Sequence, residues 1–182
     1  MKTVVIVQAR MTSTRLPGKV LKEVMGKSLL EYQIERLQRA KLADGIVIAT
    51  TSNDTDQPIV ELCERLDVAC FRGSEHDVLA RYHDAATLHQ ANTVVRVTSD
   101  CPLIDPAVID QLICFYLEHV EEYDYVTNCL KRTYPRGMDV EVFSFRVLHE
   151  AFMEAVEQEE REHVTPFIYH HPERYRLANI EF

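Results

Sequence analysis

Residues 4–19 read VVIVQARMTSTRLPGK and divide into two parts of different character. The first four are apolar and mostly β-branched, too short a run for a helix, and they predict a buried strand. The remainder holds Arg10, Arg15 and Lys19 among small and hydroxyl side chains, with a Pro-Gly turn. Cations this close together repel one another unless an anion joins them. The stretch therefore predicts an anion-binding loop at the carboxyl edge of an open sheet, with a solvated charged loop as the alternative.

Charge is divided unevenly along the chain. Residues 1–30 contain six Lys or Arg and one acid, whereas the whole chain of 182 residues carries −9, so residues 31–182 carry −14. A nucleic-acid surface needs basic charge spread along a face, and this distribution argues against one. It fits a single small, highly charged ligand bound by an otherwise acidic protein.

The remaining composition is that of an ordinary globular domain. No apolar run reaches the roughly 18 residues of a membrane span, and the start of the chain lacks the apolar segment of a signal peptide. We therefore expect a cytoplasmic protein with no membrane insertion. The five cysteines form no CxxC pair and are odd in number, which predicts buried free thiols and neither disulfides nor a zinc site.

Strand-like and helix-like patterns alternate after the first loop. Strands are expected at 46–50, 68–71 and 93–97, each followed by a polar loop, and helices at about 28–37, 57–66, 78–90, 107–119 and 145–156. Ser28 and Glu31 form a candidate capping box for the first helix. Four successive strand–loop–helix units predict an α/β fold whose mostly parallel central sheet has helices on both faces. The polar loops then share the edge where ligands bind in such sheets.

The last third of the chain has a different pattern. Short apolar runs flank KRTYPRG, whose Pro135 and Gly137 predict a loop within a hairpin-like excursion. A last helix is expected to begin at about His163, and RYRLANIEF reads as a terminal strand.

Asp100, in TSDCPLIDP, is the strongest candidate for a metal ligand. It comes directly after a buried strand, and the following Cys101-Pro102 stops that strand, so its carboxylate is expected at the loop edge facing the cationic loop. A carboxylate can help to bind a polyphosphate only through a cation between them, so Asp100 is predicted to be a Mg²⁺ ligand. A helix cap is the alternative, but Asp105 before Pro106 fits that role better.

Other motif-like patterns are weaker. Gly26-Lys27-Ser28 lacks the first glycine and the preceding strand of a P-loop, and no GxGxxG favours a dinucleotide site. Asp54-Thr55-Asp56 resembles a glycosyltransferase DxD motif, but a helix dipole favours acids in a first turn. His163 and His170-His171 could bind a metal, although surface histidines explain them better.

Two later clusters are harder to explain by structure alone. In YPRGMDVEVF, Arg136 is followed by Asp139 and Glu141, which share one face of an extended run because side chains alternate. Two such carboxylates repel unless a cation or sugar hydroxyls satisfy them. REHVTP places three polar residues at an expected helix start, either as a solvated, capped end or as a binding group: Arg161, Glu162 and His163.

Together QARMTSTRLPGKVL, VRVTSDCPLIDP, YPRGMDVEVF and REHVTP resemble the spore-coat polysaccharide biosynthesis cytidylyltransferase-like family. That family is related to the CMP-sugar synthetases that activate 3-deoxy-manno-octulosonate and sialic acid. The resemblance covers nearly the whole chain and implies a nucleotide-diphospho-sugar transferase (GT-A-like) fold. It implies a Mg²⁺-dependent nucleotidyltransferase that joins CTP to a sugar, expected to be an acid sugar, with release of pyrophosphate, in cell-surface or spore-coat polysaccharide biosynthesis.

The resemblance also implies roles for residues that match the motifs. Arg15 and Lys19 would hold the phosphates and, with Asp100 as the Mg²⁺ ligand, form the catalytic group. The nucleotide-binding set would be Ala9, Arg10, Ser13, Thr51, Ser52, Asp77 and Arg81. The acceptor-side set would be Arg136, Asp139, Glu141, Arg161, Glu162 and His163. We expect one domain, with residues 1–122 as its nucleotide-binding half and 123–182 as its acceptor-side half.

One departure from the resemblance concerns the metal. The related synthetases carry a second metal-binding aspartate in a VDxxxD-type segment after the last strand, and nothing like it follows RYRLANIEF. Either the chain is short at its C-terminus, or Asp139 or Glu141 takes that role. Two rival interpretations are a glycosyltransferase that uses a nucleotide-sugar and a non-catalytic nucleotide-binding module. A homodimer is a further possibility.

Overall fold

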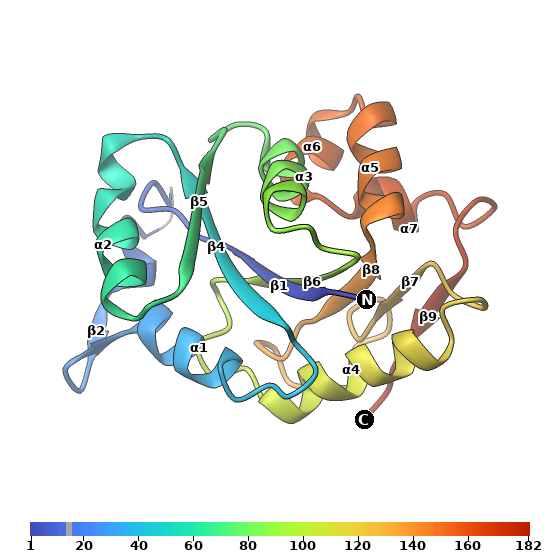
Figure 1. Cartoon of the computed structure of the whole chain (residues 1–182), viewed down its shortest axis with the longest axis horizontal. Helices are drawn as coiled ribbons and strands as arrows, with labels where there is room; N and C mark the ends of the chain where they lie inside the picture. Colours follow the sequence, from blue (N-terminus) through green and yellow to red (C-terminus); the bar gives the residue numbers. More distant parts are fainter. Residues whose placement is uncertain (14–15) are drawn as a thin grey trace.

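The computed structural model describes residues 1–13 and 16–182. A seven-stranded sheet with the order β5-β4-β1-β6-β8-β7-β9 runs through the molecule (Figure 1). Its strands are β1 (Thr3–Gln8), β4 (Gly45–Thr51), β5 (Ala69–Gly73), β6 (Thr93–Thr98), β7 (Tyr125–Thr127), β8 (Glu141–Ser144) and β9 (Leu177–Asn179). The first four of these are parallel, β8 is antiparallel to both β6 and β7, and β9 is parallel to β7. A short antiparallel pair, β2 (Glu23–Val24) and β3 (Lys27–Ser28), forms a second sheet.

Helices cover both faces of the large sheet (Figure 1). One face carries α1 (Leu29–Leu37), α2 (Gln57–Arg65) and α4 (Pro106–Glu118). The other carries α3 (Val78–Leu88), α5 (Phe145–Glu154) and α7 (Pro166–Tyr169), while α6 (Gln158–His163) packs against α3. Two short 3₁₀ helices, η1 (Lys19–Leu21) and η2 (Asp54–Asp56), lie in the loops after β1 and β4.

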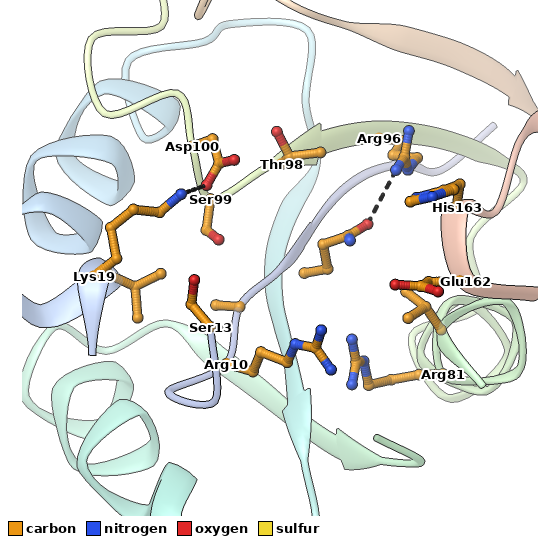
Figure 2. A pocket seen from close by; sticks show the side chains of 14 residues that line it. Arg10, Ser13, Lys19, Arg81, Arg96, Thr98, Ser99, Asp100, Glu162 and His163 are labelled. Atoms are coloured by element: carbon orange, nitrogen blue, oxygen red, sulfur yellow. Dashed lines mark hydrogen bonds and ion pairs between the residues drawn. The ribbon is translucent and has the colours of Figure 1, made fainter. Parts of the chain in front are cut away.

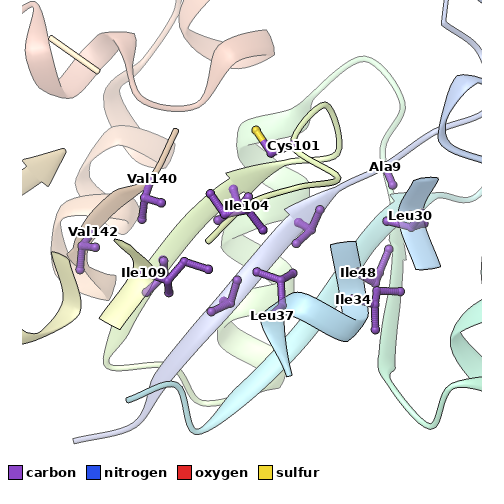
Figure 3. Packing of buried hydrophobic residues seen from close by; sticks show 14 of the residues in the cluster. Ala9, Leu30, Ile34, Leu37, Ile48, Cys101, Ile104, Ile109, Val140 and Val142 are labelled. Atoms are coloured by element: carbon purple, nitrogen blue, oxygen red, sulfur yellow. The ribbon is translucent and has the colours of Figure 1, made fainter. Parts of the chain in front are cut away.

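Alternation along β1 divides the core into two layers. Val5 and Val7 pack with the helices of the first face, and Val4 and Ile6 with those of the second. All four are almost completely buried, as a strand covered on both sides requires. Figure 3 shows how the first layer joins α1 to the strands, with Leu30, Ile34 and Leu37 directed onto the sheet. The predicted α/β class, with a mostly parallel sheet and helices on both faces, is confirmed.

Most expected elements lie within a few residues of their predicted bounds, and 128–140 form the long loop of the expected β7–β8 excursion. All five cysteines are free thiols, as predicted, but only Cys63 and Cys101 are buried, and the expected burial is wrong for Cys70, Cys114 and Cys129, which are partly exposed. In the part of the chain that the structure describes, no helix combines the length and apolar character that a bilayer crossing needs.

Two local predictions are wrong. Residues 161–163 were expected at the start of the last helix, but they form the end of α6, and the last helix, α7, begins at Pro166, close to the expected start. A reciprocal capping box between Glu157 and Glu160 begins α6 earlier, and the left-handed φ of Val164 breaks it before Pro166 begins α7.

The second error concerns the capping box of α1, of which only one half is formed. The Ser28 hydroxyl accepts the Glu31 N–H at 3.2 Å. The Glu31 carboxylate instead binds the Arg65 guanidinium of α2, at 2.8 Å. The Glu31 carboxylate therefore links α1 to α2 instead of capping α1.

The helix cap that Asp105 forms at the start of α4 can be tested by mutation. Its carboxylate accepts the Ala107 N–H at 2.9 Å, with Pro106 at the first helical position. Asp105→Ala is expected to lower the free energy of unfolding by about 1 kcal/mol, whereas Asp105→Asn, which caps as well, is expected to leave it unchanged. Urea denaturation followed by circular dichroism measures both. Equal losses in the two variants would contradict the capping role.

Candidate functional site

A cavity of about 340 Å³ opens at the carboxyl ends of β1 and β6 (Figure 2). The position follows from the topology, because parallel strands bring their exit loops to one edge. Its lining is rich in cations and hydroxyl groups, and comprises Gln8, Ala9, Arg10, Ser13, Lys19, Val20, Val78, Arg81, Arg96, Thr98, Ser99, Asp100, Glu162 and His163. We refer to it as the cationic cavity.

Lys19 and Asp100 meet across one wall of the cationic cavity. The Lys19 ammonium forms an ion pair with the Asp100 carboxylate, as the dashed line in Figure 2 shows. The Asp100 side chain remains 59% exposed and the Lys19 side chain 32% exposed. The loop after β6 therefore does face the loop after β1, as predicted, and both groups stay accessible to a ligand.

A buried carboxylate fixes the course of the loop after β1. Asp56, at the end of η2, is fully buried and accepts the Met11 N–H at 2.7 Å. Its other oxygen accepts the hydroxyls of Thr50, at 3.1 Å, and Thr51, at 2.5 Å. A buried carboxylate is stable only when its oxygens are satisfied in this way. Asp56 thus joins two exit loops, and a structural role explains the DTD sequence.

Glu75 holds the same loop from another side. It accepts the Thr12 hydroxyl at 2.6 Å and the Asn53 amide at 2.5 Å, and lies 3.8 Å from the Arg10 guanidinium. The hydrogen bonds from Thr12 and Asn53, with the nearby Arg10 cation, hold the pKa of Glu75 below its usual value. Three exit loops therefore share one polar network beneath the cationic cavity.

Arg81 is the most unusual cation of the site. Its side chain is directed toward the cationic cavity beside Arg10 (Figure 2), although the residue is only 2% exposed. One guanidinium nitrogen donates to the Ser74 carbonyl at 2.8 Å, while its buried Nε has no hydrogen-bond partner in the described part of the chain. Burial lowers the pKa of Arg81, and the Arg10 cation adds to the effect. Two adjacent guanidinium groups, one of them buried, are what an anionic ligand would stabilise.

The close packing around Arg81 explains why residue 73 is glycine. A Cβ on Gly73 would lie 2.9 Å from the Phe71 ring and 3.1 Å from Arg81 Cγ. Glycine at this position leaves the space through which the Arg81 stem reaches the cavity.

A second cavity, of about 460 Å³, adjoins the first. We refer to it as the hydroxyl-rich cavity because four hydroxyl side chains line it. Arg96, Thr98 and His163 line both cavities, so the two share one wall. The remaining lining residues are Tyr125, Cys129, Leu130, Arg132, Asp139, Glu141, Thr165 and Tyr169.

Arg96 and Glu141 form a buried ion pair in the shared wall, with their side chains 11% and 10% exposed. They lie opposite each other in the antiparallel pair of β6 and β8. Glu141 also accepts the hydroxyls of Tyr125, at 2.8 Å, and Thr165, at 3.0 Å. Burial opposes the charge of Arg96, but Glu141 outweighs it and raises the pKa of Arg96. The guanidinium therefore stays charged between the two cavities.

Arg161 fastens α6 beside the cavities. Its guanidinium binds the Asp77 carboxylate, with the shorter contact at 2.5 Å, and donates to the Phe152 carbonyl at 2.7 Å. Asp77 also accepts the Ala80 N–H and so caps α3. The next two residues after Arg161, Glu162 and His163, then line the cationic cavity.

The structure brings together only part of the predicted site. Ala9, Arg10, Ser13, Lys19, Arg81, Asp100, Glu162 and His163 line the cationic cavity, and Asp139, Glu141 and His163 the hydroxyl-rich cavity. The predicted residues that line neither cavity are Thr51, Ser52, Asp77, Arg136 and Arg161. Arg15 lies outside the described residues.

Sequence reasoning missed Arg96, Gln8, Arg132, Asp56 and Glu75. For Arg96 a signal was present, because a cation inside the apolar run TVVRV must find a buried partner. The other four had no comparable signal, because Gln8, Asp56 and Glu75 each have a partner that is distant in sequence, and Arg132 pairs with Asp139 within an irregular loop.

The donor groups of the cationic cavity fit one kind of metal binding. Mg²⁺ is usually held by one or two carboxylates together with substrate phosphates and water. Asp100 supplies one accessible carboxylate beside the cations. Among residues 1–13 and 16–182, no three His, Cys, Asp or Glu side chains gather into a metal cage. The site therefore fits a hydrated Mg²⁺ that arrives with a phosphate ligand.

Comparison with known proteins agrees with this geometry. Residues 4–182 match the family model described as Cytidylyltransferase. The spore coat polysaccharide biosynthesis protein SpsF of Bacillus subtilis is 34% identical over 181 residues, which cover 97% of this chain and 73% of that protein. A solved cytidylyltransferase from Leptospira borgpetersenii has a TM-score of 0.96 and 35% identity, covering 100% of this chain and 76% of that one.

A more distant solved structure is that of CMP:2-keto-3-deoxy-manno-octonic acid synthetase complexed with CTP. Its TM-score is 0.78 at 15% identity, and the match covers 100% of this chain and 90% of that one. The expected nucleotide-diphospho-sugar transferase-like fold is thereby confirmed. Within that class the chain belongs to the cytidylyltransferase family, and the resemblance seen in the sequence motifs was correct.

The Arg96–Glu141 pair can be tested by removing one charge. Glu141→Gln leaves a buried guanidinium without its counterion and is expected to lower the free energy of unfolding by about 3 kcal/mol. In the matched control, Glu181→Gln, the lost pair with Lys131 is exposed, and the expected change is below about 1 kcal/mol. Adding Arg96→Met to Glu141→Gln should recover part of the loss. Urea titration measures all three, and a Glu141→Gln protein as stable as the wild type would contradict the role of the pair.

Proposed function

We propose that this protein transfers the cytidylyl group of CTP to a hydroxyl of a sugar, with release of pyrophosphate, in cell-surface or spore-coat polysaccharide biosynthesis. The observation that carries the proposal is the pairing of two cavities through one wall. One offers cations, including the buried and incompletely satisfied Arg81, to a polyanion, and the other offers hydroxyls and paired carboxylates to a polyol. A transferase of this kind needs two such sites in contact.

In the nucleotide half of the reaction, the residues of the cationic cavity bind and orient CTP. Arg10 and Arg81 lie on one side of the cavity and Lys19 on another (Figure 2). We assign the phosphates to Lys19 and Arg15, and the cytidine side to Ala9, Arg10 and Ser13. Fixed cations aimed at the phosphates stabilise the charge that grows on the departing pyrophosphate.

Asp100 would hold Mg²⁺ in this arrangement. When bound there, the ion supplies charge neutralisation at the phosphates. The Asp100–Lys19 ion pair keeps both side chains extended into the cavity before ligand binds, so less ordering is needed on binding.

The hydroxyl-rich cavity is assigned to the acceptor. The Tyr169 hydroxyl can donate or accept, and the hydroxyls of Tyr125 and Thr165, which already donate to Glu141, can still accept, which suits a sugar. Asp139 pairs with Arg132 at 2.6 Å, with side chains 31% and 40% exposed. An acid sugar could exchange its carboxylate for Asp139 at this accessible guanidinium, which supports an acid sugar as the acceptor class.

Nucleotide binding tests the first half of the proposal. We expect calorimetry with CTP, UTP, GTP and ATP to show a Mg²⁺-dependent preference for CTP. Asp100→Asn should weaken CTP binding in Mg²⁺ by about tenfold to one-hundredfold, because a charge-assisted contact is lost. Without Mg²⁺ the same variant should bind CTP at least as well as wild type, since Lys19 is released from its pair. Asp105→Asn, which keeps its helix cap, is the matched control.

Turnover tests the second half. Pyrophosphate release from CTP is followed with 3-deoxy-manno-octulosonate or N-acetylneuraminate as the acceptor. Release that depends on one of these sugars would support the proposal. Failure of the wild type to bind any nucleoside triphosphate would exclude it, and release of sugar from a nucleotide-sugar would favour a glycosyltransferase instead.

A further inference from the structure

His163 occupies the boundary between the two cavities. Among residues 1–13 and 16–182, the ones that line both of them are Arg96, Thr98 and His163. In Figure 2, His163 lies beside Arg96, across the cationic cavity from Lys19 and Asp100. A hydroxyl that reaches from the hydroxyl-rich cavity toward a bound phosphate must pass this wall.

Among these three, histidine alone can accept a proton near neutral pH. The Arg96 guanidinium is held in its charged form by Glu141, and a threonine hydroxyl is too weak a base. Histidine ordinarily changes its charge between pH 5 and 8.

The carboxylates around the boundary are already engaged or misplaced for that task. Glu141 is paired with Arg96 and Asp100 with Lys19, while Asp139 lines the hydroxyl-rich cavity but not the cationic one. Glu162 lines the cationic cavity but not the hydroxyl-rich one.

The backbone at His163 is held in an uncommon conformation. Val164 has φ 74° and ψ −54°, and the Thr165 N–H donates to the His163 carbonyl at 2.9 Å, which together define a γ-turn. A positive φ is rare for a β-branched residue and strains the backbone. Val164 is nevertheless fully buried in the core against α3 and α5. Such strain is typical of backbone held for a functional reason.

Both sides of this turn are anchored to neighbouring elements of the fold. On one side, Arg161 binds Asp77 of the α3 cap and the Phe152 carbonyl. On the other, the Thr165 hydroxyl donates to Glu141 at 3.0 Å. His163 is therefore presented at the boundary by two anchored neighbours, although its own side chain is exposed.

We infer that His163 is the general base that takes the proton from the attacking acceptor hydroxyl. This inference rests on the proposed function. The hydroxyl oxygen forms a bond to the α-phosphorus of CTP, and the bond from that phosphorus to the β-phosphate bridging oxygen breaks, leaving its electron pair on pyrophosphate. The hydroxyl proton moves to a ring nitrogen of His163, which later returns it to solvent. No oxidant, reductant or further reactant is needed.

The experiment compares wild type with His163→Gln, and with His89→Gln as a matched control. His89 lies at the far end of α3, beside Lys2, and lines neither cavity. Calorimetry with CTP and Mg²⁺ should give the same affinity for all three proteins. Single-turnover pyrophosphate release with 3-deoxy-manno-octulosonate or N-acetylneuraminate should be about 10²- to 10⁴-fold slower for His163→Gln.

The pH dependence separates a base from a structural role. The wild-type rate should fall as the pH drops, because a protonated ring cannot accept the proton, and this acidic limb should be absent in His163→Gln. The charged and titratable groups that line the cavities with His163 are Arg10, Lys19, Arg81, Arg96, Asp100 and Glu162 in the cationic cavity, and Tyr125, Cys129, Arg132, Asp139, Glu141 and Tyr169 in the hydroxyl-rich cavity. Glu162→Gln should retain the acidic limb. An unchanged rate in His163→Gln, or a slower rate with the limb retained, would overturn the inference.

Failure of the proposed function would look different. If the wild-type protein binds no CTP, the proposed function is excluded before His163 is tested. If the wild type binds CTP but converts neither sugar, the rates at which the same variants slowly hydrolyse CTP are compared. In that reaction water replaces the sugar hydroxyl, and pyrophosphate release is measured. A slower release by His163→Gln would support the base, and equal release or none would overturn it.

Discussion

The ion pair between Arg96 and Glu141 is the interaction on which both halves of the structure depend. Placing two charges inside a sheet carries a desolvation cost that only good geometry and further hydrogen bonds offset. Here Glu141 accepts hydrogen bonds from the hydroxyls of Tyr125 and Thr165, and Arg96 donates one to the Gln8 side chain at 3.2 Å. The pair therefore joins β1, β6, β7, β8 and the segment before α7. It lies where the parallel part of the sheet meets the reversed strand, and that junction is also the wall between the cavities.

A second set of acids, the buried Asp56 and the partly exposed Glu75, gives the exit loops a fixed shape. A loop beyond a sheet edge has backbone groups with no strand to pair with, and they must find other partners. Asp56 accepts the Met11 N–H, and Glu75 accepts the Thr12 hydroxyl and the Asn53 amide. Three loops that would otherwise move independently are thus tied to one another. Cations on such loops are preorganised for an anion, which reduces the ordering cost of binding.

The sequence was informative where function and fold depend on local patterns. Alternation and β-branching located β1, and the turn and cations that follow it indicated the ligand-binding edge. Asp100 could be placed opposite Lys19 because the exit loops of parallel strands must share an edge. Long-range partners could not be derived in this way. The DTD sequence resembled a metal motif, and only the structure shows that Asp56 is buried and accepts the Met11 N–H. The α6 boundary was missed because the capping residues Glu157 and Glu160 stand in a run of similar acids.

Charge then explains how an acidic protein can select a small polyanion. The described lining of the cationic cavity holds four Lys or Arg, two carboxylates and one histidine, while the whole chain carries −9. At physiological ionic strength fields decay over about 8 Å, so a ligand inside the cavity experiences mainly the cations that touch it. A nucleic acid is much longer than the cavity and would have to lie against the acidic surface as well. The same contrast that would favour a small polyanion in the cavity would therefore disfavour a polymer of nucleotides, so that selection by size follows from where the charges are placed.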